Sequence, residues 1–93
     1  MVLGLLQMAL RLPDLHSLKE KRRRIKSLMT RIQNKFNVSI SEVDAQDSWQ
    51  KAILAAAHVG TDKAHSNRLL DQVLNFTESV REIEITDSRI EFY

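Results

Sequence analysis

Basic side chains crowd one stretch of this chain, where they could bind phosphate groups. Between Arg11 and Lys35 the sequence carries nine of its fourteen Lys and Arg residues and only two acids, a net charge of +7, and the densest run covers residues 19–24. Residues 71–93 carry six acids and two arginines, a net charge of −4. Such separation of charge can attract a polyanion to one part of the surface, although a solvated face without a partner is the simpler interpretation.

A helix is expected over this run, and it decides which cations could act together. At 100° per residue the basic residues fall into groups on either side of an apolar seam. The nucleic-acid contacts that this arrangement predicts are Lys19, Arg23, Arg24, Lys26, Arg31 and Lys35. Lys21 and Arg22 lie beside the seam, where their stems would cover core atoms while their charged heads reach water. Contacts of this kind hold a phosphate backbone and read little base sequence.

Other reactive side chains show no pattern typical of a metal site or a catalytic site. The three histidines are His16, His58 and His65. They lack the i, i+4 spacing of a zinc site, and the chain has no cysteine to complete one. Glu42, Asp44 and Asp47 could act as paired carboxylates or hold a hard cation. Acids at a strand end more often keep a sheet edge soluble.

Apolar alternation and helical periodicity predict six elements. They are a strand over Val2–Leu12, a helix from Ser17 to about Phe36, an edge strand over Val38–Val43, a strand over Trp49–Val59, a helix from Thr61–Asp62 to about Val80 and a strand over Glu82–Phe92. Ser17 and Glu20 have the spacing of a capping box, and Asn37 suits a left-handed helix end. The last strand changes phase, which a bulge near Thr86–Ser88 would reconcile. The alanine-rich strand over residues 49–59 would also suit a helix.

The order β-α-β-β-α-β predicts an α+β fold of the ferredoxin-like split βαβ type, in which two helices cover one face of a four-stranded antiparallel sheet. The length suits a single domain over residues 1–93. The strand over residues 49–59 is apolar on both faces, so we expect a homodimer that covers the open sheet face, with Trp49 as a core or interface anchor. Alternatively, small alanine side chains expose too little apolar area to need a cover.

Two known uses of this topology lack their key residues here. RNA-recognition motifs stack bases on aromatic residues of the central strands, and the first strand has none. Acylphosphatases bind phosphate in a glycine-bearing loop after the first strand, whereas residues 11–16 contain no glycine and include Pro13. We therefore expect no enzyme activity, no cofactor, no metal and no identifiable small-molecule ligand.

Several blocks of the sequence resemble the small bacterial YlxP-like proteins. These blocks are S-L-K-E-K-R at residues 17–22, F-N-V-S at 36–39, E-V at 42–43 and Q-D-S-W at 46–49. The resemblance covers almost the whole chain and implies a bacterial, cytoplasmic protein with a ferredoxin-like α/β domain. Genes of that family often lie beside translation and ribosome-maturation genes. The resemblance supplies no catalytic residues.

The N-terminal segment Met1–Leu10 is apolar, but it is too short to span a bilayer and lacks the features of a signal peptide. We therefore expect no membrane association. The function predicted is that of a small non-catalytic binding protein, which associates with RNA or the ribosome through its basic first helix. The alternative is a dimeric structural or regulatory module that uses the open sheet face to bind proteins.

Overall fold

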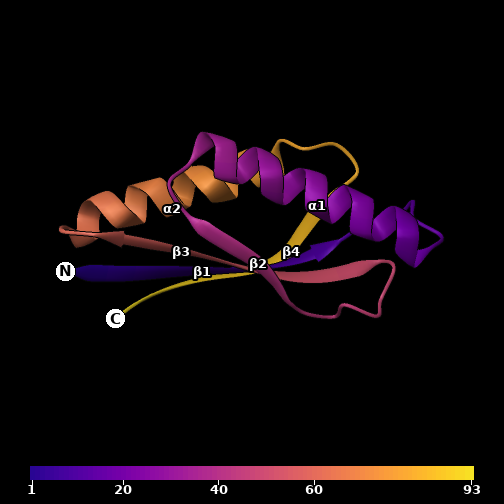
Figure 1. Cartoon of the computed structure of the whole chain (residues 1–93), viewed down its shortest axis with the longest axis horizontal. Helices are drawn as coiled ribbons and strands as arrows, with labels where there is room; N and C mark the ends of the chain where they lie inside the picture. The colour runs from indigo at the N-terminus through magenta and orange to yellow at the C-terminus, as the bar shows by residue number, and fades with distance from the viewer.

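The computed structural model describes residues 1–93 and shows the expected order of elements. They are β1 (Val2–Arg11), α1 (Leu18–Lys35), β2 (Ser39–Asp44), β3 (Lys51–Gly60), α2 (Lys63–Glu78) and β4 (Glu84–Phe92). The strands pair antiparallel in the order β2-β3-β1-β4. Both helices lie on the same side of this sheet (Figure 1). The structure therefore confirms the predicted α+β, ferredoxin-like split fold.

The hydrophobic core lies between the sheet and the two helices. Alternate residues of the central strands point into it, since successive side chains of a strand face opposite sides. The most deeply buried core residues of β1 and β3 are Leu6, Met8, Leu10, Ala52, Leu54 and Ala56. The helices contribute Ile25, Leu28, Ile32, Leu70 and Val73. The buried phase of β1 is the more uniformly apolar of its two phases in the sequence, whereas the other phase includes Gln7 and Arg11.

Side-chain caps begin both helices. The Oγ atom of Ser17 accepts a hydrogen bond from the Glu20 backbone N–H at 3.2 Å, and Asp62 accepts one from His65 at 3.2 Å. The predicted left-handed end of α1 at Asn37 is wrong, because the chain leaves the helix at Phe36 in an extended conformation. Neither helix combines the length and the apolar character that crossing a bilayer requires.

Two irregularities adjust the register of the outer strands. In β4 the pairing with β1 shifts beside Ala9, which leaves Thr86 as the extra residue, and the Thr86 hydroxyl donates to the Ala9 carbonyl at 3.2 Å. This is the predicted bulge. A second shift in β2 falls between Glu42 and Asp44 and was not predicted. Glu42, the last residue before this shift, forms a buried ion pair with Lys21 of α1.

Candidate nucleic-acid interface

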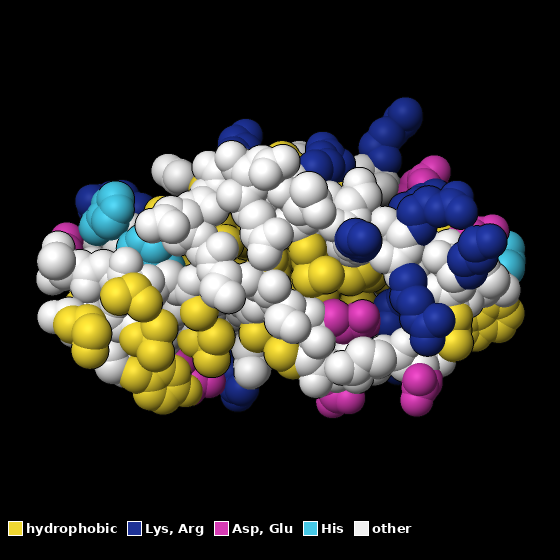
Figure 2. Space-filling model, in the orientation of Figure 1, with side chains coloured by type: hydrophobic (Ala, Val, Ile, Leu, Met, Phe, Trp, Pro, Cys, Tyr) yellow, Lys and Arg dark blue, Asp and Glu magenta, His cyan; other side chains and the backbone are white.

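The cations of α1 face solvent because the opposite side of the helix is buried. Ile25, Leu28 and Ile32 are at most 2% exposed and form the apolar seam. Five of the six predicted contact residues are exposed, and Arg24 is half-buried. Lys and Arg side chains, dark blue in Figure 2, gather over the end of the molecule where α1 begins. The eighteen residues of α1 extend over about 27 Å, long enough to follow several nucleotides of a backbone.

Most of these cations have no acidic partner within the protein. Arg24 is the exception, with Nη1 2.6 Å from a carboxylate oxygen of Glu82. The remaining ion pairs involve Arg11, Lys21 and Arg89, none of which belongs to the predicted contact set. The acidic C-terminal segment therefore neutralises only one of the six predicted contacts.

Two of the cations contact an aromatic ring of α2 instead of a carboxylate. The guanidinium carbon of Arg31 lies 5.2 Å from the centroid of the Phe76 ring, and the Lys35 ammonium lies 5.0 Å from it. Phe36 meets the same ring edge to face, with centroids 6.1 Å apart. A cation over an aromatic face retains its charge. This part of the helix surface therefore stays electropositive.

A groove runs between α1 and the segment that joins α2 to β4. Its volume is about 470 Å³. The lining residues are Arg24, Ser27, Leu28, Arg31, Ser79, Val80, Arg81, Glu82 and Ile83. A second depression of about 390 Å³ lies farther along the two helices. It shares Ser79 with the first and also includes Lys35 and Phe76, so the two depressions adjoin.

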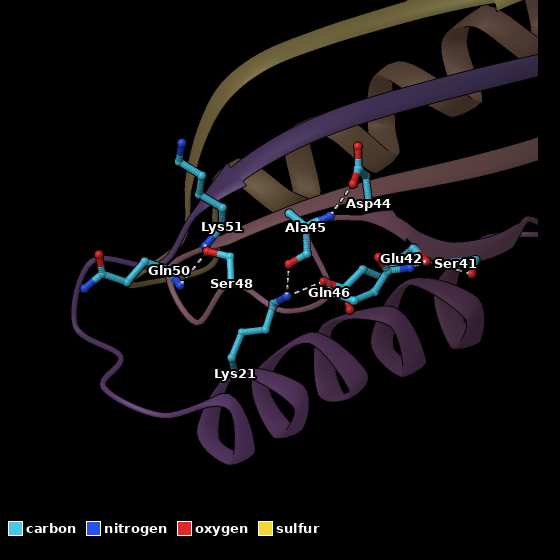
Figure 3. Close-up of polar contacts among 9 residues, drawn as sticks. All are labelled: Lys21, Ser41, Glu42, Asp44, Ala45, Gln46, Ser48, Gln50 and Lys51. Carbon is cyan, nitrogen blue, oxygen red and sulfur yellow. Dashed lines mark hydrogen bonds and ion pairs between the residues drawn. The ribbon is translucent and has the colours of Figure 1, made fainter.

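The prediction for Lys21 is wrong: its charged head does not reach water. Figure 3 shows the side chain extending from α1 toward the β2–β3 turn, where Nζ meets the Glu42 carboxylate and lies 2.9 Å from the Ala45 carbonyl oxygen. The Lys21 side chain is 0% exposed and that of Glu42 is 14% exposed. Helical periodicity placed Lys21 beside the seam correctly, and Glu42 shares the strand phase of the buried Ile40, but only the packing of α1 on β2 shows that the two side chains meet. Lys21 is thus a structural residue.

The other acids of the β2–β3 region do not form a cation site. Glu42 is occupied by Lys21, and the Asp44 carboxylate accepts from the Ala45 backbone N–H at 2.7 Å. No group of three or more metal-ligating side chains is found anywhere in the chain.

Trp49 was expected at the start of a strand, and this is wrong. It lies in the turn before β3, is 43% exposed, and packs edge to face against His16 at 6.1 Å.

His58 and His65 lie in different surroundings, one buried and the other exposed. His58 is 5% exposed, and its Nδ1 atom lies 2.8 Å from the Oγ atom of Ser66, which is itself fully buried. His58 is therefore a packed histidine of the core. His65 is exposed, with its ring centroid 5.9 Å from that of His58.

Sequence reasoning missed the contribution of residues outside α1. Arg81, Glu82 and Phe76 complete the surface beside the helix, yet they lie in or next to the acidic segment of the sequence. Helical periodicity relates only residues on the same helix. The acidic stretch gave a partial signal of this contribution, because in a domain this small the stretch must fold back against another part of the chain.

Comparisons with known proteins agree with the fold and with the resemblance noted above. A family model described as "Protein of unknown function (DUF503)" matches residues 3–90. The "Uncharacterized protein YlxP" of Bacillus subtilis (strain 168) is 46% identical over 80 residues, which cover 86% of this chain and 87% of that protein. A solved structure titled "De novo designed protein Foldit4" matches with a TM-score of 0.52 at 15% identity, over 100% of this chain and 94% of that one, and shows similarity of fold alone. The chain therefore belongs to the family described as Protein of unknown function (DUF503), together with YlxP.

Proposed function

We propose that the protein is a small, non-catalytic, cytoplasmic binding protein that associates with RNA, including RNA exposed on the ribosome, through α1. One observation carries the proposal. Five of the six predicted contact residues lie along an exposed helix without an acidic partner. Lys and Arg side chains in this state bind phosphates by releasing counterions, and they need no sequence-specific contact.

The surface is better suited to binding the backbone of a single-stranded or irregular RNA than to reading bases on the face of the sheet. No aromatic residue of a central strand is available to stack a base, since β1 and β3 contain none. The cations instead lie beside Phe76 and Phe36 in the adjoining depressions. Basic grooves lined with aromatic rings are typical of proteins that follow single strands without strong sequence preference.

A salt series with a charge-matched control tests the proposal. The variant carries Arg23→Ser, Lys26→Ser and Arg31→Ser, all exposed and without acidic partners. The control, Lys51→Ser, Lys63→Ser and Arg68→Ser, removes the same charge from other elements. Binding to a labelled single-stranded RNA is measured by fluorescence anisotropy. If each of the three α1 residues contacts a phosphate, the slope of log K against log salt should become shallower by about 2 units in the α1 variant only.

Co-sedimentation with ribosomes extends the test to a physiological target. We expect the wild-type chain to sediment with ribosomes at low salt, and this association should be lost after nuclease treatment. Equal weakening in the two triple variants would show that net charge, and not the α1 surface, governs binding. That result, or no RNA binding at all by the wild type, would refute the proposal.

The proposal includes no reaction step, and the side chains with reactive groups support this. His58 and Ser66 are within hydrogen-bond distance, but both are buried between β3 and α2. A buried hydroxyl cannot meet a substrate, so this pair is better explained as a satisfied core contact. Lys21 and Glu42 are likewise engaged with each other.

A second candidate function is that of a structural or regulatory module that forms a homodimer through the open sheet face. Side chains on the face away from the helices include Leu3, Val59 and Tyr93, which are 37%, 63% and 69% exposed. At about 3.3 Å per residue and about 4.8 Å between strands, the face measures about 600 Å². Two such faces would bury about 1,200 Å², the lower end of the range for specific interfaces. A second copy of the chain matches this area and shape.

Charge also favours a copy of the same chain over an unlike partner. Ion pairs at the rim of the face join Arg11 to Glu84 and Arg89 to Glu91. A two-fold axis can place each sign beside its opposite in the partner copy. Sedimentation equilibrium should therefore show a dimer that Ala57→Glu on β3 dissociates, while Gln33→Glu on α1 leaves it intact. Val59→Glu is a second variant at a more exposed position, in case Ala57→Glu fails to fold. A wild-type monomer at all accessible concentrations would rule this candidate out.

A further inference from the structure

Three arginines converge on the groove between α1 and the α2–β4 segment, although they come from different elements. Arg24 and Arg31 lie on one face of α1, and Arg81 follows the end of α2. The hydroxyl-bearing residues Ser27 and Ser79 complete its polar lining. A planar guanidinium presents paired donors that match phosphate oxygens, so a group of arginines favours a phosphate over a simple halide ion.

The groove is lined by a single carboxylate, that of Glu82. The backbone is strained at the same residue. Glu82 is the only acid among the lining residues and pairs with Arg24 at 2.6 Å. Its φ of 68° lies in the left-handed region, which is unfavourable for a residue with a side chain. The next residue, Ile83, is 7% exposed and returns the chain to the core. The turn that brings Ile83 inward therefore also holds Glu82 against Arg24.

A ligand can displace the Glu82 carboxylate from Arg24. Both side chains are partly open to solvent, with 39% and 50% exposed. Ion pairs at that exposure contribute little to stability, because solvent screens the two charges. A phosphate that engages several of the arginines at once can therefore displace the carboxylate.

The geometry points to this groove as the site that takes a backbone phosphate of single-stranded RNA, with Glu82 as the internal group that the phosphate displaces. The inference rests on the proposed function and locates it: Arg81, outside α1, becomes a direct contact, and Glu82 becomes a residue that weakens binding. Arg31, held over the Phe76 ring, stays in place for the ligand. The remaining cations of α1 would hold the neighbouring phosphates.

Two substitutions with matched controls test the site, again by anisotropy with a labelled oligouridine strand over a salt series. Arg81→Ser should weaken binding about tenfold, and its salt slope should fall by about 0.7. Its control is Arg68→Ser on the exposed surface of α2. Glu82→Gln should tighten binding about two- to fivefold by freeing Arg24. Its control is Glu84→Gln, which frees Arg11 from a comparable exposed pair on the sheet. Circular dichroism confirms that all four variants fold.

The outcomes separate the groove from the wider proposal. Binding that responds to Arg81 and Glu82 more than to Arg68 and Glu84 supports the groove. Equal effects within each matched pair would overturn the groove inference, while loss of binding in the α1 triple variant would still uphold the RNA function. Absence of RNA binding by the wild-type chain would overturn both.

Discussion

The ammonium group of Lys21 is enclosed between α1 and the β2–β3 turn, where it meets the Glu42 carboxylate and the Ala45 carbonyl oxygen. This contact joins the first turns of α1 to the edge of the sheet. Every buried side-chain nitrogen and oxygen of the chain, including those of this contact, has at least one hydrogen-bond partner. A buried pair of this kind costs little while it is complete, but breaking it leaves an isolated charge.

Replacing Lys21 alone should destabilise the protein strongly. Lys21→Met leaves the Glu42 carboxylate unpaired in a largely buried position, and we expect a loss of about 3–5 kcal/mol in the free energy of unfolding. Urea titration followed by the fluorescence of Trp49, the only tryptophan, measures it. The control Lys26→Met, at an exposed position of α1, should change stability by no more than about 0.5 kcal/mol.

The double variant Lys21→Met, Glu42→Leu should recover most of that stability, because it removes both charges together. It also keeps the test informative if the single variant does not fold. Similar stabilities for Lys21→Met and Lys26→Met would contradict the structural role assigned to the pair.

Ala45→Gly should stabilise the protein. Ala45 has a φ of 62°, where a Cβ atom is unfavourable and glycine is not. We expect a gain of about 0.5–1 kcal/mol, seen as a rise in Tm of a few degrees by calorimetry. Ala64→Gly in α2, where glycine only adds backbone freedom, should shift Tm in the opposite direction. A lower Tm for Ala45→Gly would show that the turn does not need the left-handed conformation.

Ser66→Ala should cost about 1–3 kcal/mol, because it leaves His58 Nδ1 buried without a partner. Denaturant titration measures the loss, and Ser27→Ala, at an exposed position of α1, is the control. Loss of the hydroxyl with no change in the midpoint would mean that water replaces it, and the site would then be more open than the structure shows.

Tyr93 should keep its proton to higher pH than an ordinary tyrosine. Its hydroxyl donates to the Glu91 carboxylate at 2.9 Å, and this hydrogen bond and the charge of Glu91 raise the pKa of Tyr93 above its usual value near 10. Because the bond and the charge both favour the neutral phenol, Glu91→Ala should move the titration midpoint to lower pH. Ultraviolet absorbance of the phenolate reports it cleanly, since this is the only tyrosine. Glu84→Ala, which removes an equal charge from another part of β4, should leave the midpoint in place.

The features that depend on neighbours along the chain could be predicted from the amino-acid sequence. Alternation identified the buried phase of β1, and the spacing of Ser17 and Glu20 identified the start of α1. The phase change in the last strand indicated the bulge at Thr86. These features follow from periods of 2.0 and 3.6 residues and from short-range hydrogen bonds, so a local pattern is sufficient to predict them.

Tertiary structure alone decided which charges remain available on the surface. The sequence showed that α1 is basic, but not that Lys21 is consumed by Glu42 or that Glu82 reaches Arg24. Nor could it show that Arg81 would line a groove with Arg31. Each of these contacts joins elements that are distant along the chain, and each depends on how those elements pack in three dimensions. Local periodicity carries no information about such pairs, because it relates residues only within one element.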